Sequence, residues 1–437
     1  MRLIDKLTIL TESAKYDAAC TSSGANRPGH TVMAGVCHSF TADGRCISLL
    51  KVLMSNSCAY KCRYCINSAG NDVPRATFTP EELATVTVEF YRRNYIEGLF
   101  LSSGVIKSPD HTMELMIDAL AILRHRYDFW GYIHAKAIPG ASPELIYKLG
   151  LLVDRMSVNI EMPSEKSLNL LAPDKTKDAI LAPMKQIKSE IEENSYALTR
   201  YKNAPTFASA GQATQMIIGA TPDTDHQIIT LASAMYSKYD LRRVFYSAYI
   251  PVVEDSLLPS IITTPPLLRE HRLYQADFLL RQYEFAADEI LSEETPNFNP
   301  YLDPKCNWAI NNMHLFPIDV NTASIQELLR VPGIGPTSSK RIVVARREGR
   351  LGFGELKRIG VVLKRAQHFI VTKDNASGSR LGKDSVVRAL IDPKIYSFGT
   401  EQLSLFGGTY PAPALLGGAS TVSDAVEETV LQLTSVL

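Results

Sequence analysis

Short apolar runs alternate with helix-like segments along residues 48–255, and this alternation limits the possible folds more than any other feature. Parallel strands joined by crossover helices produce such a pattern. Six strands favour an α/β fold with an open, partial (β/α)6 barrel over a closed barrel of eight strands. The predicted strands are 48–54, 98–103, 131–137, 153–160, 214–220 and 243–250.

Two of the predicted helices have clear start signals. Thr79 is expected to be an N-cap, with Pro80 at the first helical position and Glu82 completing a capping box. Ser142, followed by proline and glutamate, repeats this arrangement, and Gly150 is expected to end the second helix. These signals support helical crossovers between the strands.

The chain of 437 residues is longer than one ordinary domain. We expect a lead segment at 1–47 that packs on the barrel, the barrel at 48–255 and a helical connector at 256–315. A small all-α domain at 316–373 and a mostly flexible tail at 374–437, rich in small residues, complete the prediction.

The N-terminal residues are interrupted by Arg2, Asp5 and Lys6, so they lack the apolar core of a signal peptide. No uninterrupted apolar run in the sequence is long enough to cross a bilayer. We therefore expect a soluble cytoplasmic protein without a membrane partner. Its seven cysteines are an odd number, which favours metal or catalytic use over a disulfide framework.

Three of the cysteines follow the first predicted strand in a C-x3-C-x2-C array: Cys58, Cys62 and Cys65. A zinc site would need a fourth ligand, which His38 or Cys46 could provide. Three thiolates without a fourth ligand better suit a cubane iron–sulfur cluster with one open iron.

This spacing, with Tyr64 before the third cysteine and a series of βα units around it, resembles the radical SAM superfamily. The resemblance implies a [4Fe–4S] cluster whose open iron binds S-adenosylmethionine. An electron from the cluster then cleaves the sulfonium and yields a 5′-deoxyadenosyl radical, which takes a hydrogen atom from the substrate. The barrel positions the cofactor and excludes water.

The resemblance also implies cofactor contacts at the ends of other strands. Ser102, Ser103 and Gly104 stand where the family usually has a Gly-Gly-Glu-like loop that holds the methionyl amine, although the Glu is missing here. Residues that resemble the family's ribose or methionyl contacts, or the strand along the adenine, are Asn159, Glu161, Ile217 and Gly219. Ordinary polarity at strand ends is the alternative for these positions.

His134 and Lys136 share one face of a predicted strand by its period of two. Together they indicate an anionic ligand, such as the cofactor carboxylate or a phosphate, and a buried ion pair with Glu161 is the alternative. Cys20, Cys37 and Cys46 could ligate a second cluster or donate a hydrogen atom, or they are plain reduced thiols.

Residues 330–373 hold eleven basic and two acidic residues, a balance of +9 in a chain of zero net charge. Within them, Gly333 and Gly335 precede a helix that carries Ser338, Lys340 and Arg341, and the pattern resembles a helix-hairpin-helix module with a degenerate second hairpin. Its glycines let the backbone approach a phosphate at the helix N-terminus. We expect salt-dependent binding to duplex DNA without sequence preference. Protein docking and a solvated face are the alternatives.

The combination resembles a group of DNA modification or repair radical SAM proteins over residues 10–410. The resemblance implies a nucleic-acid pathway, an external electron donor and a uracil-DNA-glycosylase-like partner. We predict an enzyme that acts on a flipped or damaged nucleotide in DNA. The alternatives are a tethered protein with a structural or redox-sensing cluster, and an RNA-modifying enzyme.

The tail contains an apolar motif that resembles the peptide by which bacterial proteins bind the sliding clamp. Its residues are Gln402, Leu403, Ser404, Leu405 and Phe406. Leu405 and Phe406 would fill an apolar pocket on the clamp, as apolar residues in a flexible segment commonly do in a partner's groove. Folding back onto the protein's own core is the alternative. We expect a clamp complex of about micromolar affinity that Leu405→Ala/Phe406→Ala abolishes; unchanged binding would show that the tail has another use.

Overall fold

The computed structural model describes residues 1–15, 35–40, 46–201, 203–375 and 383–391. These residues form two compact units. Among the described residues, the first unit contains those of Met1–Pro222 and Ala234–Pro265, and the second contains Asp223–Ser233 and those from Pro266 to Ile391. None of the described helices has both the length and the apolar character that a membrane span requires.

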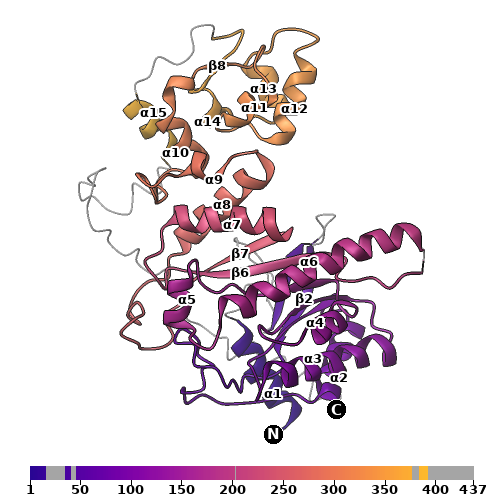
Figure 1. Ribbon diagram of the computed structural model, residues 1–437. Helices are drawn as coiled ribbons and strands as arrows, with labels where there is room; N and C mark the ends of the chain where they lie inside the picture. Colours follow the sequence, from indigo (N-terminus) through magenta and orange to yellow (C-terminus); the bar gives the residue numbers. More distant parts are fainter. Residues whose placement is uncertain (16–34, 41–45, 202, 376–382, 392–437) are drawn as a thin grey trace. The chain divides into compact units, whose positions relative to one another are not determined.

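The first unit is built on a seven-stranded sheet in sequential order (Figure 1). β1 pairs antiparallel with β2, and β2 to β7 are all parallel. The six parallel strands confirm the predicted partial barrel. The strands are β1 (Val36–Phe40), β2 (Cys46–Leu53), β3 (Gly98–Ser102), β4 (Tyr132–Lys136), β5 (Arg155–Ser157), β6 (Gln212–Ile218) and β7 (Arg243–Ala248).

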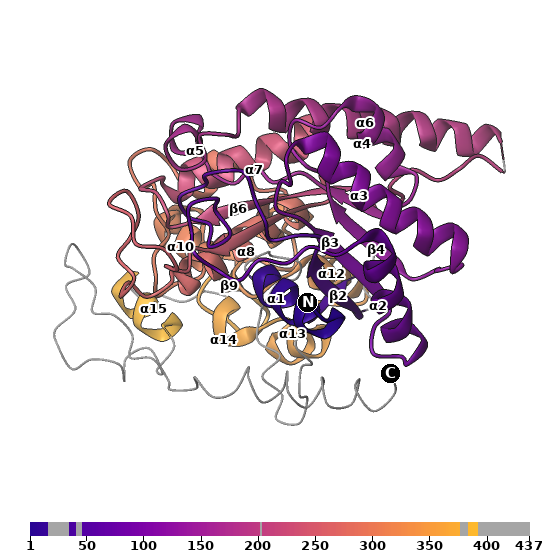
Figure 2. The same ribbon diagram turned by 90° about the horizontal axis from the view of Figure 1, so that it is seen from below.

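Helices cover the outer face of the parallel sheet, and α2, α3, α4 and α6 pack side by side in chain order (Figure 2). The strands beneath them are almost wholly buried, as expected for a parallel sheet with both faces covered. The helices are α2 (Pro80–Arg92), α3 (Pro109–Ala121) with the π-helix η1 (Ile122–Arg126), α4 (Pro143–Gly150), α5 (Glu165–Leu171), α6 (Lys177–Arg200) and α7 (Asp225–Tyr239).

The predicted helix signals are present, although one of them acts differently. Thr79 caps α2 and forms the capping box with Glu82. Ser142 precedes α4, but its side chain makes no capping hydrogen bond. Gly150 is the last residue of α4, and a Cβ there would lie 2.1 Å from the ring of Phe207. Close packing, and not a left-handed conformation, therefore explains this glycine.

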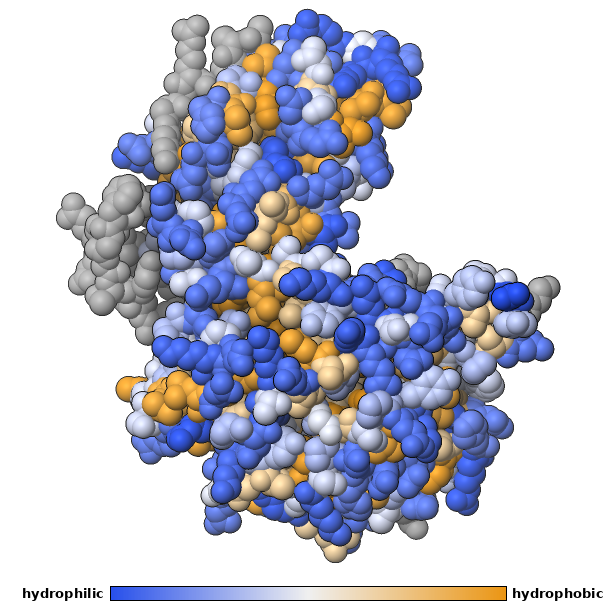
Figure 3. All heavy atoms as spheres, in the orientation of Figure 1, coloured by the Kyte–Doolittle hydropathy of each residue, from blue (hydrophilic) through white to orange (hydrophobic). Residues whose placement is uncertain are grey.

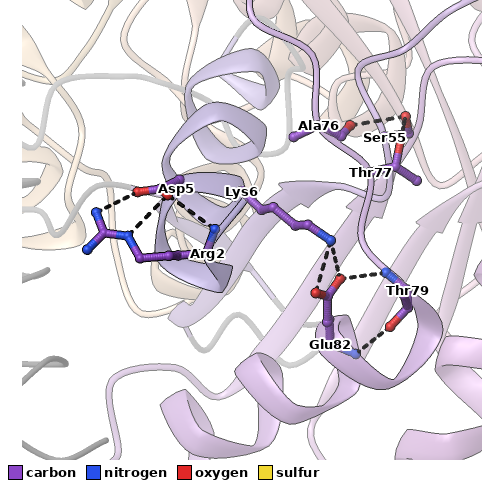
Figure 4. Close-up of polar contacts among 8 residues, drawn as sticks. All are labelled: Arg2, Asp5, Lys6, Ser55, Ala76, Thr77, Thr79 and Glu82. Atoms are coloured by element: carbon purple, nitrogen blue, oxygen red, sulfur yellow. Dashed lines mark hydrogen bonds and ion pairs between the residues drawn. The ribbon is translucent and has the colours of Figure 1, made fainter.

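An N-terminal helix, α1 (Leu3–Ala14), packs against β2. Lys6 on α1 forms an ion pair of 2.7 Å with Glu82, the same residue that closes the capping box of α2 (Figure 4). The antiparallel strand β1 was not predicted, because Val36–Phe40 lies in the segment that we expected only to pack on the barrel.

The second unit is mostly helical. Of the predicted connector at 256–315, residues 266–315 belong to the same compact unit as the basic segment, and residues 256–265 belong to the first unit. Its elements are α8 (Leu267–Gln282), α9 (Ala287–Ile290), α10 (Pro304–Asn311), the 3-10 helix η2 (Met313–Leu315), β8 (Ile318–Asp319), α11 (Ile325–Arg330), α12 (Pro336–Ala345), α13 (Phe353–Ile359), α14 (Leu363–Ala366), β9 (Ile370–Val371) and α15 (Lys383–Leu390). β8 and β9 pair in parallel.

Candidate functional site

The three cysteines of the array lie in the loop that leaves the carboxyl end of β2. This loop packs against the segment that follows β3. The backbone N–H of Val105 donates to the Sγ atom of Cys58 over 3.3 Å. A Cβ on Gly104 would lie only 3.0 Å from the Cβ of Cys58 and 3.2 Å from the carbonyl oxygen of Ser55. The absence of a side chain at Gly104 therefore lets the two segments meet.

Burial dominates the chemistry of the thiols. It raises the pKa of the Cys62 thiol, and the nearby ammonium of Lys175 opposes this rise. It raises the pKa of Cys65 to about 12, with the charges of Cys62 and Cys58 acting in the same direction. Because iron binds the thiolate, cluster binding must release protons from these groups.

The donor set fits an iron–sulfur cluster. Among the residues that the structure describes, no three His, Cys, Asp or Glu side chains are close enough to hold one metal ion. A [4Fe–4S] cluster does not require such a group, because each thiolate binds a different iron atom. The fit has independent support at Asn159, whose buried Oδ1 has no hydrogen-bond partner. A buried polar atom is normally satisfied, so this atom is available to a ligand.

The zinc alternative receives no support from the placement of its proposed fourth ligands. Cys46 begins β2, and the cysteine loop leaves the opposite end of the same strand. His38 pairs with Ser48 near that starting end. Both residues are therefore separated from Cys58 by most of the strand.

Lys175 is a residue of the site that sequence reasoning missed. Its Nζ forms an ion pair of 2.6 Å with Oε1 of Glu161, and their side chains are only 14% and 8% exposed. Burial would lower the pKa of Lys175, but the charges of Glu161 and Cys62 outweigh it and raise the pKa. The pair is neutral overall, and its ammonium lies close enough to Cys62 and Cys65 to favour their thiolate forms. Its position between a loop and a helix follows no periodic pattern.

We expect Lys175→Met to lower the free energy of unfolding by about 3–5 kcal/mol, since it leaves the Glu161 carboxylate buried without its partner. Urea denaturation of the full chain measures the change. The double variant Lys175→Met/Glu161→Gln should recover most of the loss, because it removes the stranded charge. Equal stabilities of the single variant and the parent would contradict a buried, coupled pair.

Glu161 occupies an unusual backbone conformation. Its φ is +61°, in the left-handed region that non-glycine residues rarely adopt. β5 ends at Ser157, so both Asn159, which we expected within a strand at 153–160, and Glu161 lie beyond the end of the strand. Glu161 instead bridges to Met216 on β6, and its carbonyl accepts from the N–H of Ile217 over 2.7 Å. Strained positions of this kind concentrate at functional sites.

The remaining predicted cofactor residues lie on the same unit. Ser102 ends β3 and is buried, and the hydroxyl of Ser103 donates to the carbonyl of Gly104 over 2.7 Å. Tyr64 hydrogen-bonds to Cys62, and burial raises its pKa. Gly219 directly follows β6 with a φ of +86°. Their contacts with S-adenosylmethionine stay predictions.

His134 and Lys136 both lie buried on β4, and each bonds to a neighbouring strand. Nε2 of His134 lies 3.0 Å from Oγ of Ser157, and Nζ of Lys136 donates to Oε1 of Gln215 over 2.8 Å. Burial, followed by the charges of Arg155 and Lys136, holds the pKa of His134 well below its usual value, so the imidazole is neutral. Glu161 itself pairs with Lys175.

The second unit contains the hairpin that the sequence predicted. Gly333 connects α11 to α12 with a φ of +87°, and its carbonyl accepts from the N–H of Val362 over 2.9 Å. A Cβ on Gly333 would lie 2.5 Å from the carbonyl oxygen of Val362. Gly335 is the N-cap residue of α12. The hairpin turn therefore rests directly against a second turn, between α13 and α14.

The predicted DNA-binding side chains of this unit differ in their contacts: Ser338 and Arg341 bond to backbone within the unit, although Arg341 is exposed. The buried hydroxyl of Ser338 donates to the carbonyl of Gly360, and Arg341 donates to the carbonyl of Ile359. Lys340 is exposed. Hydrophilic residues predominate on the face of this unit drawn in Figure 3, with apolar residues between them. DNA contacts by Gly333, Gly335, Ser338, Lys340 and Arg341 remain predictions.

A buried lysine forms a hydrogen bond with the backbone of the same hairpin. Nζ of Lys305 donates to the carbonyl oxygen of Ile334 over 2.6 Å and lies 4.5 Å from the centre of the Tyr283 ring. Burial lowers its pKa to about 7. Sequence reasoning did not single out Lys305, because nothing in the local pattern links α10 to the hairpin turn.

Several predicted residues lie outside the described part of the chain. They include the clamp-like motif Gln402–Phe406 and Cys20. Cys37 is buried on β1 and Cys46 is exposed at the start of β2. Neither belongs to the cysteine loop.

Comparisons with known proteins identify two parts of the chain. Residues 52–201 match the model of the radical SAM superfamily, about a third of the chain. Residues 316–363 match the helix-hairpin-helix motif. Radical SAM proteins use a [4Fe–4S] cluster and S-adenosylmethionine, in agreement with the cofactors predicted from the cysteine array. None of the curated proteins compared matches this chain.

Solved structures of other proteins give weak likenesses. HydG, a maturase of the [FeFe]-hydrogenase, is 15% identical with a TM-score of 0.39, over 52% of this chain and 48% of that chain. SuiB from Streptococcus suis is 13% identical with a TM-score of 0.36, over 57% and 52%. Cobalamin-dependent OxsB is 11% identical with a TM-score of 0.33, over 72% and 46%. The matches span about half the length of these structures and carry no argument about activity.

Proposed function

We propose that this chain, which contains a radical SAM domain at residues 52–201 and a helix-hairpin-helix motif at residues 316–363, is a radical SAM enzyme that modifies or repairs DNA. The observation that carries the proposal is the presence of both parts in one chain. The first part supplies a cysteine loop at the end of a parallel strand, where such folds place their chemistry. The second supplies a basic hairpin.

Cys58, Cys62 and Cys65 would hold the cluster, and Asn159 has an unsatisfied oxygen for a ligand group. The bound cluster and S-adenosylmethionine supply a 5′-deoxyadenosyl radical that removes a hydrogen atom from a substrate. The task of the chain is to position the cofactor and to exclude water. The buried strands shield the site, and the Lys175 ammonium offsets negative charge beside the thiols.

The hairpin supports DNA as the substrate class. The first turn of α12 leaves backbone N–H groups without intrahelical acceptors, and the helix dipole favours an anion there. Exposed Lys340 adds positive charge on α12, and Arg347, also exposed, follows the end of the helix. Such contacts hold a phosphate backbone without reading sequence. A base in the stack would have to be flipped or already damaged to react.

Binding as a function of salt tests the nucleic-acid assignment. We expect the full chain to prefer duplex DNA over structured RNA at moderate salt. Lys340→Ala/Arg341→Ala should reduce the slope of log affinity against log salt by about two, one for each phosphate that the variant no longer neutralises. A control that removes two exposed lysines of the first unit, Lys166 and Lys185, should leave the slope unchanged. A preference for RNA, or equal slopes for both variants, would overturn this assignment.

The proposal extends to three partners that follow from the sequence. A sliding clamp would bind the Gln402–Phe406 motif, a uracil-DNA-glycosylase-like protein would share the pathway, and an external donor would reduce the cluster. The family resemblance supports the last two partners, and the peptide motif supports the first.

A further inference from the structure

The loop that carries the three cysteines is closed at its base. Ser55 and Thr77 form an antiparallel bridge, and their hydroxyls lie 2.7 Å apart (Figure 4). The hydroxyl of Ser55 also donates to the carbonyl of Ala76 over 3.2 Å. Residues 56–76 therefore leave and return at one point, and their internal contacts determine the shape of the loop.

One side chain inside this loop joins its two arms. The Arg75 guanidinium donates to the carbonyl of Asn56 over 2.6 Å, on the arm that leads to Cys58. It also donates to three carbonyls on the returning arm after Cys65, over 2.7–2.9 Å, at Asn67, Ser68 and Asn71. One planar fork thus satisfies four acceptors from both sides of the cysteine array. A guanidinium has the rigid, planar set of donors that reaches four acceptors, whereas an ammonium presents its donors from a single nitrogen atom.

Asn71 extends this arrangement to the third cysteine. Its Nδ2 donates to the carbonyls of Cys65 and Ile66 over 3.0 and 3.1 Å. Arg75 and Asn71 therefore hold backbone on both sides of the array, and Asn71 holds Cys65 directly. Arg75 also lines an open pocket of about 380 Å³ together with Cys58.

We propose that Arg75 is a positioning residue that, with Asn71, fastens the cysteine loop in the shape that binds the cluster. The inference rests on the proposed iron–sulfur site. Its physical basis is the entropy of the loop, because three thiolates can bind one cluster only when both arms are held. Without the four hydrogen bonds of the Arg75 guanidinium, part of the free energy of cluster binding is used to order the loop, so the affinity for the cluster falls.

Arg124 offers a matched control within the same unit. It also makes four hydrogen bonds, to the carbonyls of Leu152, Phe129 and Gly131 and to the carboxylate of Asp154. These partners precede β4 and β5, at the amino ends of the strands, whereas the cysteine loop follows a carboxyl end. Arg124→Lys therefore removes an equivalent fork without touching the loop.

The test compares Arg75→Lys and Arg124→Lys in the full, reconstituted chain. The readouts are the rate at which a chelator removes iron, the electron paramagnetic resonance spectrum of the reduced cluster, and Tm. We expect both variants to lower Tm, but only Arg75→Lys to release iron faster, by about tenfold, the equivalent of one to two hydrogen bonds. Its spectrum should also change. Equal iron release in the two variants would overturn the proposal.

If Arg75→Lys does not fold, Asn71→Ala decides the question, because it removes only the two bonds to Cys65 and Ile66. Faster iron release supports the fastened loop, and a rate equal to that of the parent contradicts it. Failure of the proposed iron–sulfur site is distinguishable, since the parent chain would then retain no cluster after reconstitution.

Discussion

Replacing Cys62 with alanine is expected to abolish reductive cleavage of S-adenosylmethionine by the reconstituted chain and to remove most of its iron. Cys62 is the most buried of the three thiols, at 6% exposure, and it interacts with both Tyr64 and Lys175. Loss of one of three thiolates leaves an iron atom without its protein ligand, so the cluster is not held. Iron and sulfide content per chain and the yield of 5′-deoxyadenosine measure the effect.

Cys306→Ala is the matched control for this substitution. Cys306 is also buried, at 2% exposure, but it lies in the second unit on α10. The same atoms are removed, so the two variants should differ only through the cluster. We expect Cys306→Ala to retain iron and cleavage. Cleavage that survives in Cys62→Ala would contradict the assignment of the catalytic cluster to this cysteine array.

The second large effect is expected at the hairpin turn of the second unit. Gly333→Ala puts a side chain on a residue with a φ of +87°, 2.5 Å from the carbonyl oxygen of Val362. A left-handed non-glycine residue costs about 1–3 kcal/mol, and the contact with a backbone atom must be relieved by movement. Because the turn sets the start of α12, we expect DNA affinity to fall by about tenfold or more. Fluorescence anisotropy with duplex DNA and thermal unfolding measure the two effects.

Gly354→Ala provides the comparison within the same unit. Gly354 lies in α13, and a Cβ there meets nothing within 4 Å. This variant should change stability by no more than about 0.5 kcal/mol and leave DNA binding intact. If Gly333→Ala binds DNA as well as Gly354→Ala does, the hairpin turn is not the phosphate contact.

The sequence predicted those features that depend on local pattern. The six parallel strands were found because apolar runs alternate with helical segments, and the start of α2 was found because Thr79 and Glu82 have capping-box spacing. The hairpin was found because Gly333 and Gly335 precede a helix in a pattern that resembles the helix-hairpin-helix module. In each case the signal is a short stretch of sequence that lies within or beside the element that it predicts.

Features that depend on tertiary contact were not predictable in this way. β5 is only three residues long, and Glu161 leaves the strand geometry to bridge to β6 and pair with Lys175. Arg75 bonds to carbonyls up to 19 residues away, and carbonyl groups have no side-chain signature. Gly150 was placed at a helix end for a conformational reason, whereas its cause is the ring of Phe207.

The most direct test of the central claim follows a hydrogen atom from DNA to the cofactor. The reconstituted chain is incubated with S-adenosylmethionine, a reductant and duplex DNA that carries deuterium on its sugar and base carbons. Mass spectrometry then determines the deuterium content of the 5′-deoxyadenosine. We predict 5′-deoxyadenosine that carries one deuterium, and none of this product from Cys62→Ala. Formation of 5′-deoxyadenosine that never acquires deuterium from duplex DNA would contradict the account.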